Sequence, residues 1–114
     1  MSDCIFCRIV AGDIPARIVH QDDEVIAFHD LAPQAPTHVL VVPRKHIASL
    51  LDAAPEDGPL LGRLQAAAVE IARREGLDQG GFRLVTNTLE GAGQSVFHLH
   101  VHLLGGRRFV WPPG

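Results

Sequence analysis

Alternating histidines constrain the fold of this chain more than any other feature. His98, His100 and His102 alternate with aliphatic residues within residues 97–104. Because successive side chains of a β-strand point to opposite faces, this pattern predicts a strand with three imidazoles on one face and aliphatic core side chains on the other. Imidazole serves as acid, base, nucleophile or metal ligand near neutral pH. We therefore expect this strand either to build an active site or to hold a metal.

Two helices are expected in the rest of the chain. Apolar residues recur at three- and four-residue spacing over residues 56–75, which is typical of an amphipathic helix packed on a sheet. Pro55 suits its start and Gly76 its end. A shorter helix is expected over residues 4–11, with Asp3 as its N-cap and a glycine directly after it.

Short β-branched and alternating segments predict four further strands, and the pattern as a whole predicts one α+β domain over residues 1–114. The segment 44–54 is ambiguous. The expected strands cover residues 17–20, 24–29, 38–42 and 81–87, and the expected loops cover residues 30–37 and 88–95.

Charge and hydropathy exclude two classes of partner. A formal net charge of −3 does not suit a protein held on nucleic acid by bulk charge, although Arg44-Lys45 and Arg107-Arg108 form small basic pairs that either meet a phosphate or are simply solvated. No apolar run is long enough to cross a bilayer, and the first residues lack a signal-peptide pattern. We expect a cytoplasmic protein without nucleic-acid or membrane partners. In that compartment the Cys4-x-x-Cys7 pair indicates metal binding or redox work rather than a structural disulfide.

The histidine motif and other segments of this chain resemble the histidine triad (HIT) superfamily, and in particular its Hint-like branch. The similarity runs from about residue 4 to the last residue. Besides His98–Leu104, the similar segments are Phe28-His29-Asp30, Pro33–His38, Pro43–Ile47, Gly93–Val96 and Trp111–Gly114. The resemblance implies the HIT fold, an antiparallel sheet of about five strands with one main and one or two short helices on one face. It also implies a homodimer whose two sheets join side by side.

The resemblance further implies an activity. Hint-like proteins bind purine mononucleotides and hydrolyse phosphoramidates such as AMP joined to an amine, so an adenosine 5′-monophosphoramidase-type hydrolase is expected. By this similarity His100 attacks phosphorus and forms a nucleotidyl-histidine, while a backbone carbonyl near His98 fixes its tautomer. His102 contacts the phosphate and serves, with Ser95, as a candidate donor to the leaving group.

The residues implied for nucleotide binding fall into base, ribose and phosphate groups. Asn87 and Gln94 have an equally good interpretation as loop residues that bond within the loop. By the same similarity His38 supports the triad, and Trp111 reaches the partner subunit's site. The base group is Ile5, Phe6, Ile9, Phe28, His29 and Leu31, the ribose group is Asp30, and the phosphate group is Asn87, Gly93, Gln94, Ser95, His100 and His102.

Many relatives with the cysteine pair bind zinc, and the resemblance implies the same here. The ligands would be Cys4, Cys7, His46 and His98, a closed Cys₂His₂ set that suits a structural ion and is not required for catalysis. The alternative is a pair of small buried thiols. One departure from the family pattern is Leu89, which stands where many relatives have glycine and leaves the shape of its loop in doubt.

Four interpretations of the function remain open at this level. The chain is either a phosphoramidase or a dinucleoside polyphosphate hydrolase that uses the same nucleophile. A third interpretation is a metalloenzyme with the three histidines as ligands, and a fourth is a nucleotide-binding protein without catalysis.

Overall fold

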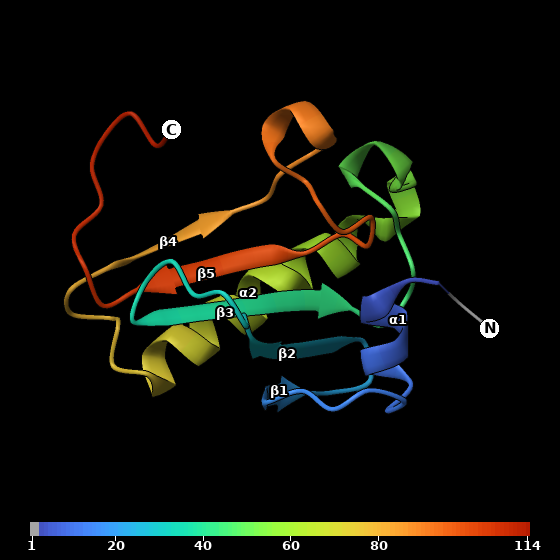
Figure 1. The fold of residues 1–114 in the computed structure, drawn as a ribbon, viewed down its shortest axis with the longest axis horizontal. Helices are drawn as coiled ribbons and strands as arrows, with labels where there is room; N and C mark the ends of the chain where they lie inside the picture. The colour runs from blue at the N-terminus through green and yellow to red at the C-terminus, as the bar shows by residue number, and fades with distance from the viewer. Residues whose placement is uncertain (1–2) are drawn as a thin grey trace.

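Five antiparallel strands form the centre of the protein (Figure 1) in a computed structural model that describes residues 3–114. The strands follow the order β1-β2-β3-β5-β4 across the sheet. This agrees with the α+β fold expected from the sequence. The strands are β1 (Ile18–Gln21), β2 (Val25–His29), β3 (Thr37–Pro43), β4 (Phe82–Val85) and β5 (Val101–Gly105). The helices are α1 (Ile5–Val10) and α2 (Gly58–Arg74), with single 3₁₀ turns at Leu50–Asp52, Pro55–Asp57 and Glu90–Ala92.

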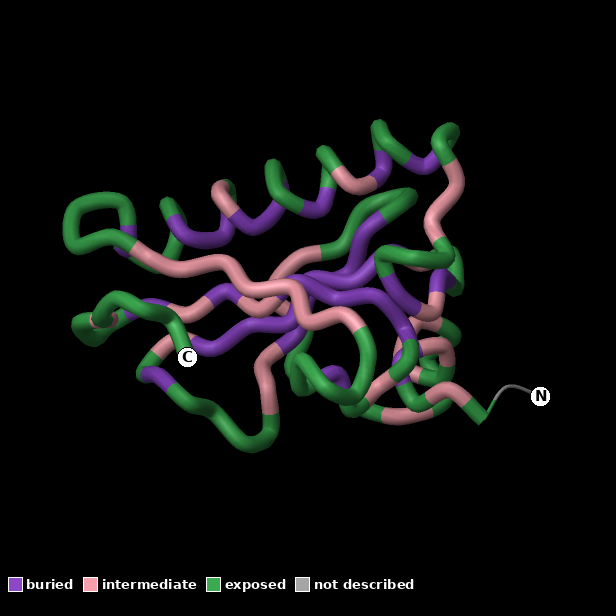
Figure 2. The backbone as a smooth tube through the Cα atoms, turned by 90° about the horizontal axis from the view of Figure 1, so that it is seen from above, coloured by how far each residue is buried: buried purple, intermediate pink, exposed green. Residues whose placement is uncertain are grey.

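Helix α2 covers one face of the sheet (Figure 2). The expected start at residue 56 falls in the 3₁₀ turn instead, because the Asp57 carboxylate accepts a hydrogen bond from the Ala54 amide at 2.8 Å. Gly76 follows the helix with a φ of +75°, the left-handed conformation that ends helices. Burying Leu64 and Ile71 contributes about 1.5–3 kcal/mol each. The inward side of α2 is Leu60, Leu64, Ala67, Ala68, Ile71 and Ala72.

The two faces of the sheet bury separate sets of side chains. Val39 and Val41 of β3 pack toward α2, whereas Leu40 and Val42, their neighbours in the strand, pack with Phe6 of α1. Alternation along β3 therefore feeds two cores. The expectation of helices on one face is wrong in this respect, because the apolar side of α1 needs the second face of the sheet for its burial.

The N-cap of α1 also differs from the prediction. Cys4, and not Asp3, is the N-cap, because its Sγ atom accepts a hydrogen bond from the Cys7 amide at 3.3 Å. Thiol sulfur is a weak acceptor, so propensity alone favoured the carboxylate. Neither α1 nor α2 has the length and apolar character needed to span a membrane, and residues 3–114 contain no other helix that does.

The histidine segment keeps its predicted alternation but only part of its predicted strand. Ladder pairing with β3 begins at Val101, opposite Val41. Before it, the amide of Leu99 donates at 2.6 Å to the carbonyl of Ile47, in the loop after β3. The aliphatic residues of the segment still pack toward α2 and its imidazoles lie on the other face.

The two basic pairs hold loops in place. Lys45 Nζ lies 2.7 Å from the buried Asp57 carboxylate, which keeps the pKa of that carboxyl below its usual value. Arg44 donates to the carbonyl oxygen of Asp22 at 2.7 Å. Arg107 donates to the carbonyl oxygen of Gln34 at 3.0 Å. These contacts give three of the four cations a role in packing.

Candidate active site

A cleft of about 250 Å³ lies between α1 and the sheet face opposite α2. Phe28 and Leu40 come from adjacent strands in that face, and Asp30 follows directly after β2. The same space is lined by Ser95, which lies just before the histidine segment of residues 97–104, and by His100 and His102 within that segment. The cleft is lined by Ile5, Phe6, Ile9, Pro15, Ala16, Arg17, Phe28, His29, Asp30, Leu31, Leu40, Ser95, Val96, His100 and His102.

The backbone fixes the tautomer of His100. Its Nδ1 atom lies 2.7 Å from the carbonyl oxygen of His98, and a carbonyl only accepts hydrogen bonds. Nδ1 therefore carries the proton of the neutral ring, and Nε2 keeps its lone pair. The ring is buried, with the edge of Phe6 against it at a centroid separation of 5.2 Å. This leaves a nucleophilic nitrogen on a ring that cannot rotate without losing its hydrogen bond.

A chain of hydrogen bonds fixes the tautomer of His102 in the opposite sense. The amide of Gln34 donates at 3.0 Å to His38 Nδ1, so the His38 proton lies on Nε2. That atom is 2.9 Å from His102 Nδ1, which must accept. His102 consequently carries its proton on Nε2. Burial, together with His100 and His38, lowers the pKa of His102 to about 4. At neutral pH the ring is an uncharged hydrogen-bond donor.

The same argument decides whether Asp30, His38 and His102 could hold a metal, since their ligand atoms lie within 4.8 Å of one another. One Asp30 oxygen accepts from the Ala32 amide at 2.8 Å, and the other lies 3.4 Å from His38 Nε2. The Gln34 amide occupies the Nδ1 lone pair of His38. A metal on Nε2 would then require a doubly deprotonated ring. This cluster fits a hydrogen-bond relay better than a metal site.

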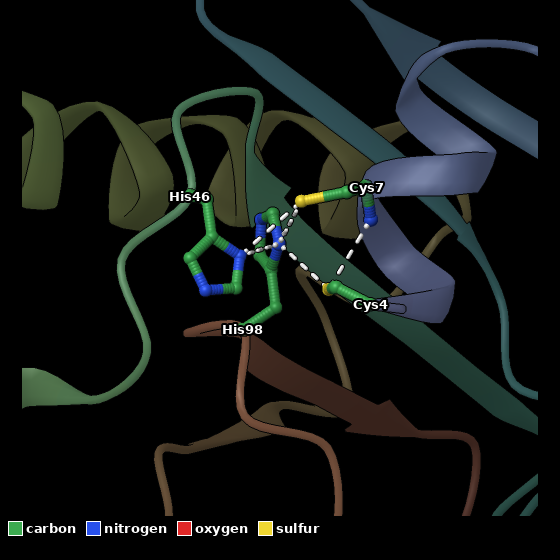
Figure 3. A group of neighbouring side chains, drawn as sticks. All are labelled: Cys4, Cys7, His46 and His98. Carbon is green, nitrogen blue, oxygen red and sulfur yellow. Dashed lines mark hydrogen bonds between the residues drawn. The ribbon is translucent and has the colours of Figure 1, made fainter. Parts of the chain in front are cut away.

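A metal ion does suit the cluster formed by Cys4, Cys7, His46 and His98 (Figure 3). His98 donates from Nε2 to the Pro43 carbonyl at 2.7 Å, so its Nδ1 lone pair is directed at the cluster. Nδ1 lies 3.4 Å from each sulfur and 3.2 Å from His46 Nδ1, and the Cys7 sulfur lies 3.2 Å from the same His46 atom. Tetrahedral zinc bonds imply separations of about 3.3 Å between nitrogens and about 3.6 Å between nitrogen and sulfur. The donor set and its spacing suit zinc.

The three histidines of the motif do not converge on one point. The His98 ring is directed at the cysteines, His100 at a backbone carbonyl and His102 at His38. The geometry therefore does not support a metalloenzyme in which these three rings bind one metal ion.

Three of the expected phosphate-binding residues lie outside the cleft lining. The Gln94 side chain accepts from the Leu89 amide at 2.8 Å and donates to the Ala48 carbonyl at 2.7 Å. The Gly93 amide donates to the Glu90 carbonyl at 2.9 Å, within the loop. Asn87 lies beside Gly93. In this structure the side-chain amide of Gln94 organises the loop that carries Ser95. Direct phosphate contact by Asn87, Gly93 and Gln94 stays a prediction.

Some residues of the cleft lining were not expected from the sequence. Leu40 could have been found because it lies two residues after His38 in a predicted strand, which places it on the same face as that histidine. Pro15, Ala16 and Arg17 carry no local signal, because only the pairing of β1 with β2 brings them to the cleft. Trp111 lies outside the cleft of its own chain and is 83% exposed.

Comparisons with known proteins agree with this geometry. A family model described as scavenger mRNA decapping enzyme C-term binding matches residues 3–108. A HIT-like protein of Synechococcus elongatus is 53% identical over 112 residues, 98% of this chain and 97% of that relative. The crystal structure of a HIT family hydrolase from Legionella pneumophila has a TM-score of 0.96 at 49% identity and covers 98% of this chain and 100% of that one. A histidine triad protein from Clostridium difficile has a TM-score of 0.93 at 44% identity, with 96% of each chain covered.

Proposed function

Because this chain belongs to the histidine triad family, whose solved structures include hydrolases, we propose that it hydrolyses phosphoramidates of purine nucleoside monophosphates. The observation that carries this proposal is the 2.7 Å contact between His100 Nδ1 and the His98 carbonyl. It leaves the Nε2 lone pair available at the cleft without any need for a general base.

The reaction follows from that lone pair. His100 Nε2 attacks phosphorus, and the P–N bond breaks with its electron pair going to the amine. The imidazole that now carries the nucleotide is cationic, and the His98 carbonyl stabilises it through the Nδ1–H bond. Water then attacks phosphorus and releases the nucleoside monophosphate, with Nε2 as leaving group and one proton of the water passing to solvent. Two in-line steps restore the enzyme.

His102 and Ser95 have different tasks in this scheme. His102 is neutral with its proton on Nε2, so it donates a hydrogen bond to a phosphoryl oxygen rather than a proton to the amine. Ser95 is exposed at the cleft and can pass a proton from solvent to the departing nitrogen. The structure thus favours Ser95 over His102 as the donor to the leaving group.

The rest of the cleft suits a nucleoside. Phe6 and Phe28, whose rings meet edge to face at 5.3 Å, offer an apolar slot for a base. Asp30 has one carboxylate oxygen engaged by the Ala32 amide and the other 3.4 Å from His38. The second oxygen can accept from ribose hydroxyls.

Zinc has a structural role in this proposal. When bound by Cys4, Cys7, His46 and His98 it would leave no coordination position for water. It would join the start of α1 to the loop after β3 and to the histidine segment. Its contribution is therefore to stability, and the chemistry at phosphorus depends on His100, His102 and Ser95.

A homodimer is part of the proposal as well. Strand β4 lies at one edge of the sheet and pairs only with β5 within residues 3–114. Its other edge is available to the β4 strand of a second copy. The exposed Trp111 then has a partner surface to meet. Sedimentation equilibrium of the purified protein tests this, since a monomer at all concentrations would contradict it.

The central test is the covalent intermediate. An AMP–amine conjugate labelled with ³²P is mixed with the enzyme, and the reaction is quenched in mild base, where phosphorus–imidazole bonds survive. We expect label on the peptide that contains His100, and faster turnover of this conjugate than of diadenosine polyphosphates. Hydrolysis without labelled peptide would contradict the mechanism. Faster cleavage of the polyphosphate would favour the alternative hydrolase.

A further inference from the structure

The cleft contains a cation that the proposed chemistry does not use. Arg17 directly precedes β1 and lines the cleft, whereas His102 lies on β5, three strands away in the sheet order. At about 4.8 Å per strand, about 14 Å separates the two backbones. Arg17 and the imidazoles therefore lie toward different ends of one cleft.

The register of the sheet shows what lies between these ends. His102 faces Leu40 on β3, and Leu40 faces Phe28 on β2. The amide of His29, next to Phe28, donates at 3.1 Å to the Arg17 carbonyl. A nucleotide with its phosphate at the imidazoles and its ribose at Asp30 consequently extends its base toward β1 and Arg17.

The Arg17 side chain is available for a ligand. It is exposed, and its guanidinium forms no hydrogen bond or ion pair with any residue of 3–114. Its neighbours Pro15 and Ala16 in the lining are uncharged. By contrast, Arg44, Arg63 and Arg107 are held by contacts within the protein.

We propose that Arg17 reads the edge of the base and makes this site selective for 6-oxopurine nucleotides, those of guanine and hypoxanthine, over adenine nucleotides. The inference rests on the proposed function. Guanine presents two acceptors, O6 and N7, which match the fork of a guanidinium. Adenine keeps N7 but has an amino group at position 6, so the N–H donors of the guanidinium would face another hydrogen-bond donor.

Calorimetric titration with GMP, IMP and AMP tests the proposal on the intact protein. IMP has O6 and N7 but lacks the 2-amino group of guanine. We expect GMP and IMP to bind about tenfold more tightly than AMP. Equal affinity for all three nucleotides, or IMP binding as weakly as AMP, would overturn the proposal.

Two substitutions test whether Arg17 causes the preference for GMP and IMP over AMP. Arg17→Met should bring the three affinities to within about twofold of one another, and Arg17→Glu should reverse the order because a carboxylate accepts from the adenine amino group. Arg73→Met is the matched control, since Arg73 lies in α2 on the other face of the sheet and its loss changes the net charge equally. It should keep the tenfold ratio. A ratio unchanged in Arg17→Met would overturn the proposal, as would a ratio lost in Arg73→Met.

The same titrations separate two kinds of failure. If no nucleotide binds to the wild-type protein, the proposed function fails and this inference fails with it. If all three bind equally and the phosphoramidate is hydrolysed, the proposed function stands and only the role of Arg17 is wrong. Thermal unfolding of each variant shows whether it is folded, which is expected because Arg17 is at the surface.

Discussion

The carbonyl oxygen of His98 lies 2.7 Å from Nδ1 of His100, while the His98 ring belongs to the cysteine cluster. One residue therefore contributes its backbone to the candidate nucleophile and its side chain to the candidate metal centre. The His98 ring is held by the Pro43 carbonyl at 2.7 Å and is completely buried. The position of this residue couples two sites that differ in chemistry.

Replacing the candidate nucleophile should separate chemistry from binding. We expect His100→Ala to lower kcat for an AMP–amine conjugate by at least about 10³-fold, because His102, the other triad histidine in the cleft lining, has its Nδ1 lone pair engaged by His38 and its proton on Nε2. The affinity for AMP should change by less than about threefold. Steady-state kinetics and calorimetry measure the two quantities. His20→Ala, at a histidine outside the cleft lining, is the control, and an active His100→Ala protein would refute the assignment.

Substitution of Asp30 should act mainly on binding. Asp30→Asn keeps an oxygen for the Ala32 amide but removes the charge that would accept from ribose. We expect KM to rise about tenfold with kcat nearly unchanged, since a hydrogen bond to a charged group contributes about 1.5–3 kcal/mol. The deoxyribose analogue of the substrate should show a smaller effect of the substitution. An unchanged KM would count against the ribose contact.

Acid should destabilise the protein through its buried imidazoles. Burial lowers the pKa of His102 to about 4 and also lowers the pKa of His38. In the unfolded chain both groups titrate near 6.5, so the unfolded state binds more protons between pH 6.5 and about 4. The free energy of unfolding should then fall as the pH decreases through this range. Urea unfolding at pH 7 and pH 5 measures the fall.

His102→Gln provides the control for this prediction. The Gln side-chain oxygen can still accept from His38 Nε2, but the group no longer titrates. The loss of stability between pH 7 and pH 5 should be smaller in this variant. The same pH dependence in both proteins would show that His102 does not cause it.

Metal content should depend on the cluster of Cys4, Cys7, His46 and His98 and not on the cluster of Asp30, His38 and His102. We expect the wild-type protein to contain about one zinc per chain, and Cys7→Ser to contain little, because a tetrahedral site loses one of four ligands. The Tm of the wild type should fall on chelation. Mass spectrometry with inductively coupled plasma measures the metal. His38→Ala removes a residue of the second cluster and should retain its zinc, and a metal-free wild type would end the hypothesis.

Leu89 should be a point of backbone strain. Its φ of 71° and ψ of 166° lie in a region that favours glycine, and bonds from Gln94 hold it there. We expect Leu89→Gly to raise the free energy of unfolding by about 1 kcal/mol, because relief of strain exceeds the entropy cost of glycine. Urea unfolding measures the change. The matched control is Leu51→Gly at another exposed leucine, whose φ is not positive, and it should not stabilise the protein.

Local patterns in the sequence account for much of the fold. The three- and four-residue spacing in α2 predicts a helix because one side of it meets the sheet, and the β-branched apolar run in β3 predicts a strand that is buried on both faces. The alternation of His98, His100 and His102 likewise places three imidazoles on one face. The N-cap of α1 was predicted wrongly, since a thiol replaced the expected carboxylate.

The tautomers of His98 and His102 were decided only by the tertiary structure, whereas that of His100 depends on a carbonyl two residues earlier in the chain. The ring orientations depend on Pro43, on Gln34 and on the His98 carbonyl, and the first two of these are distant from the triad in sequence. The approach of Arg17 to the cleft depends in the same way on the pairing of β1 with β2. Residue spacing specifies which face a side chain occupies, because that is a property of the local backbone. Hydrogen-bond partners across the sheet depend on the register between strands, and only the folded chain sets that register.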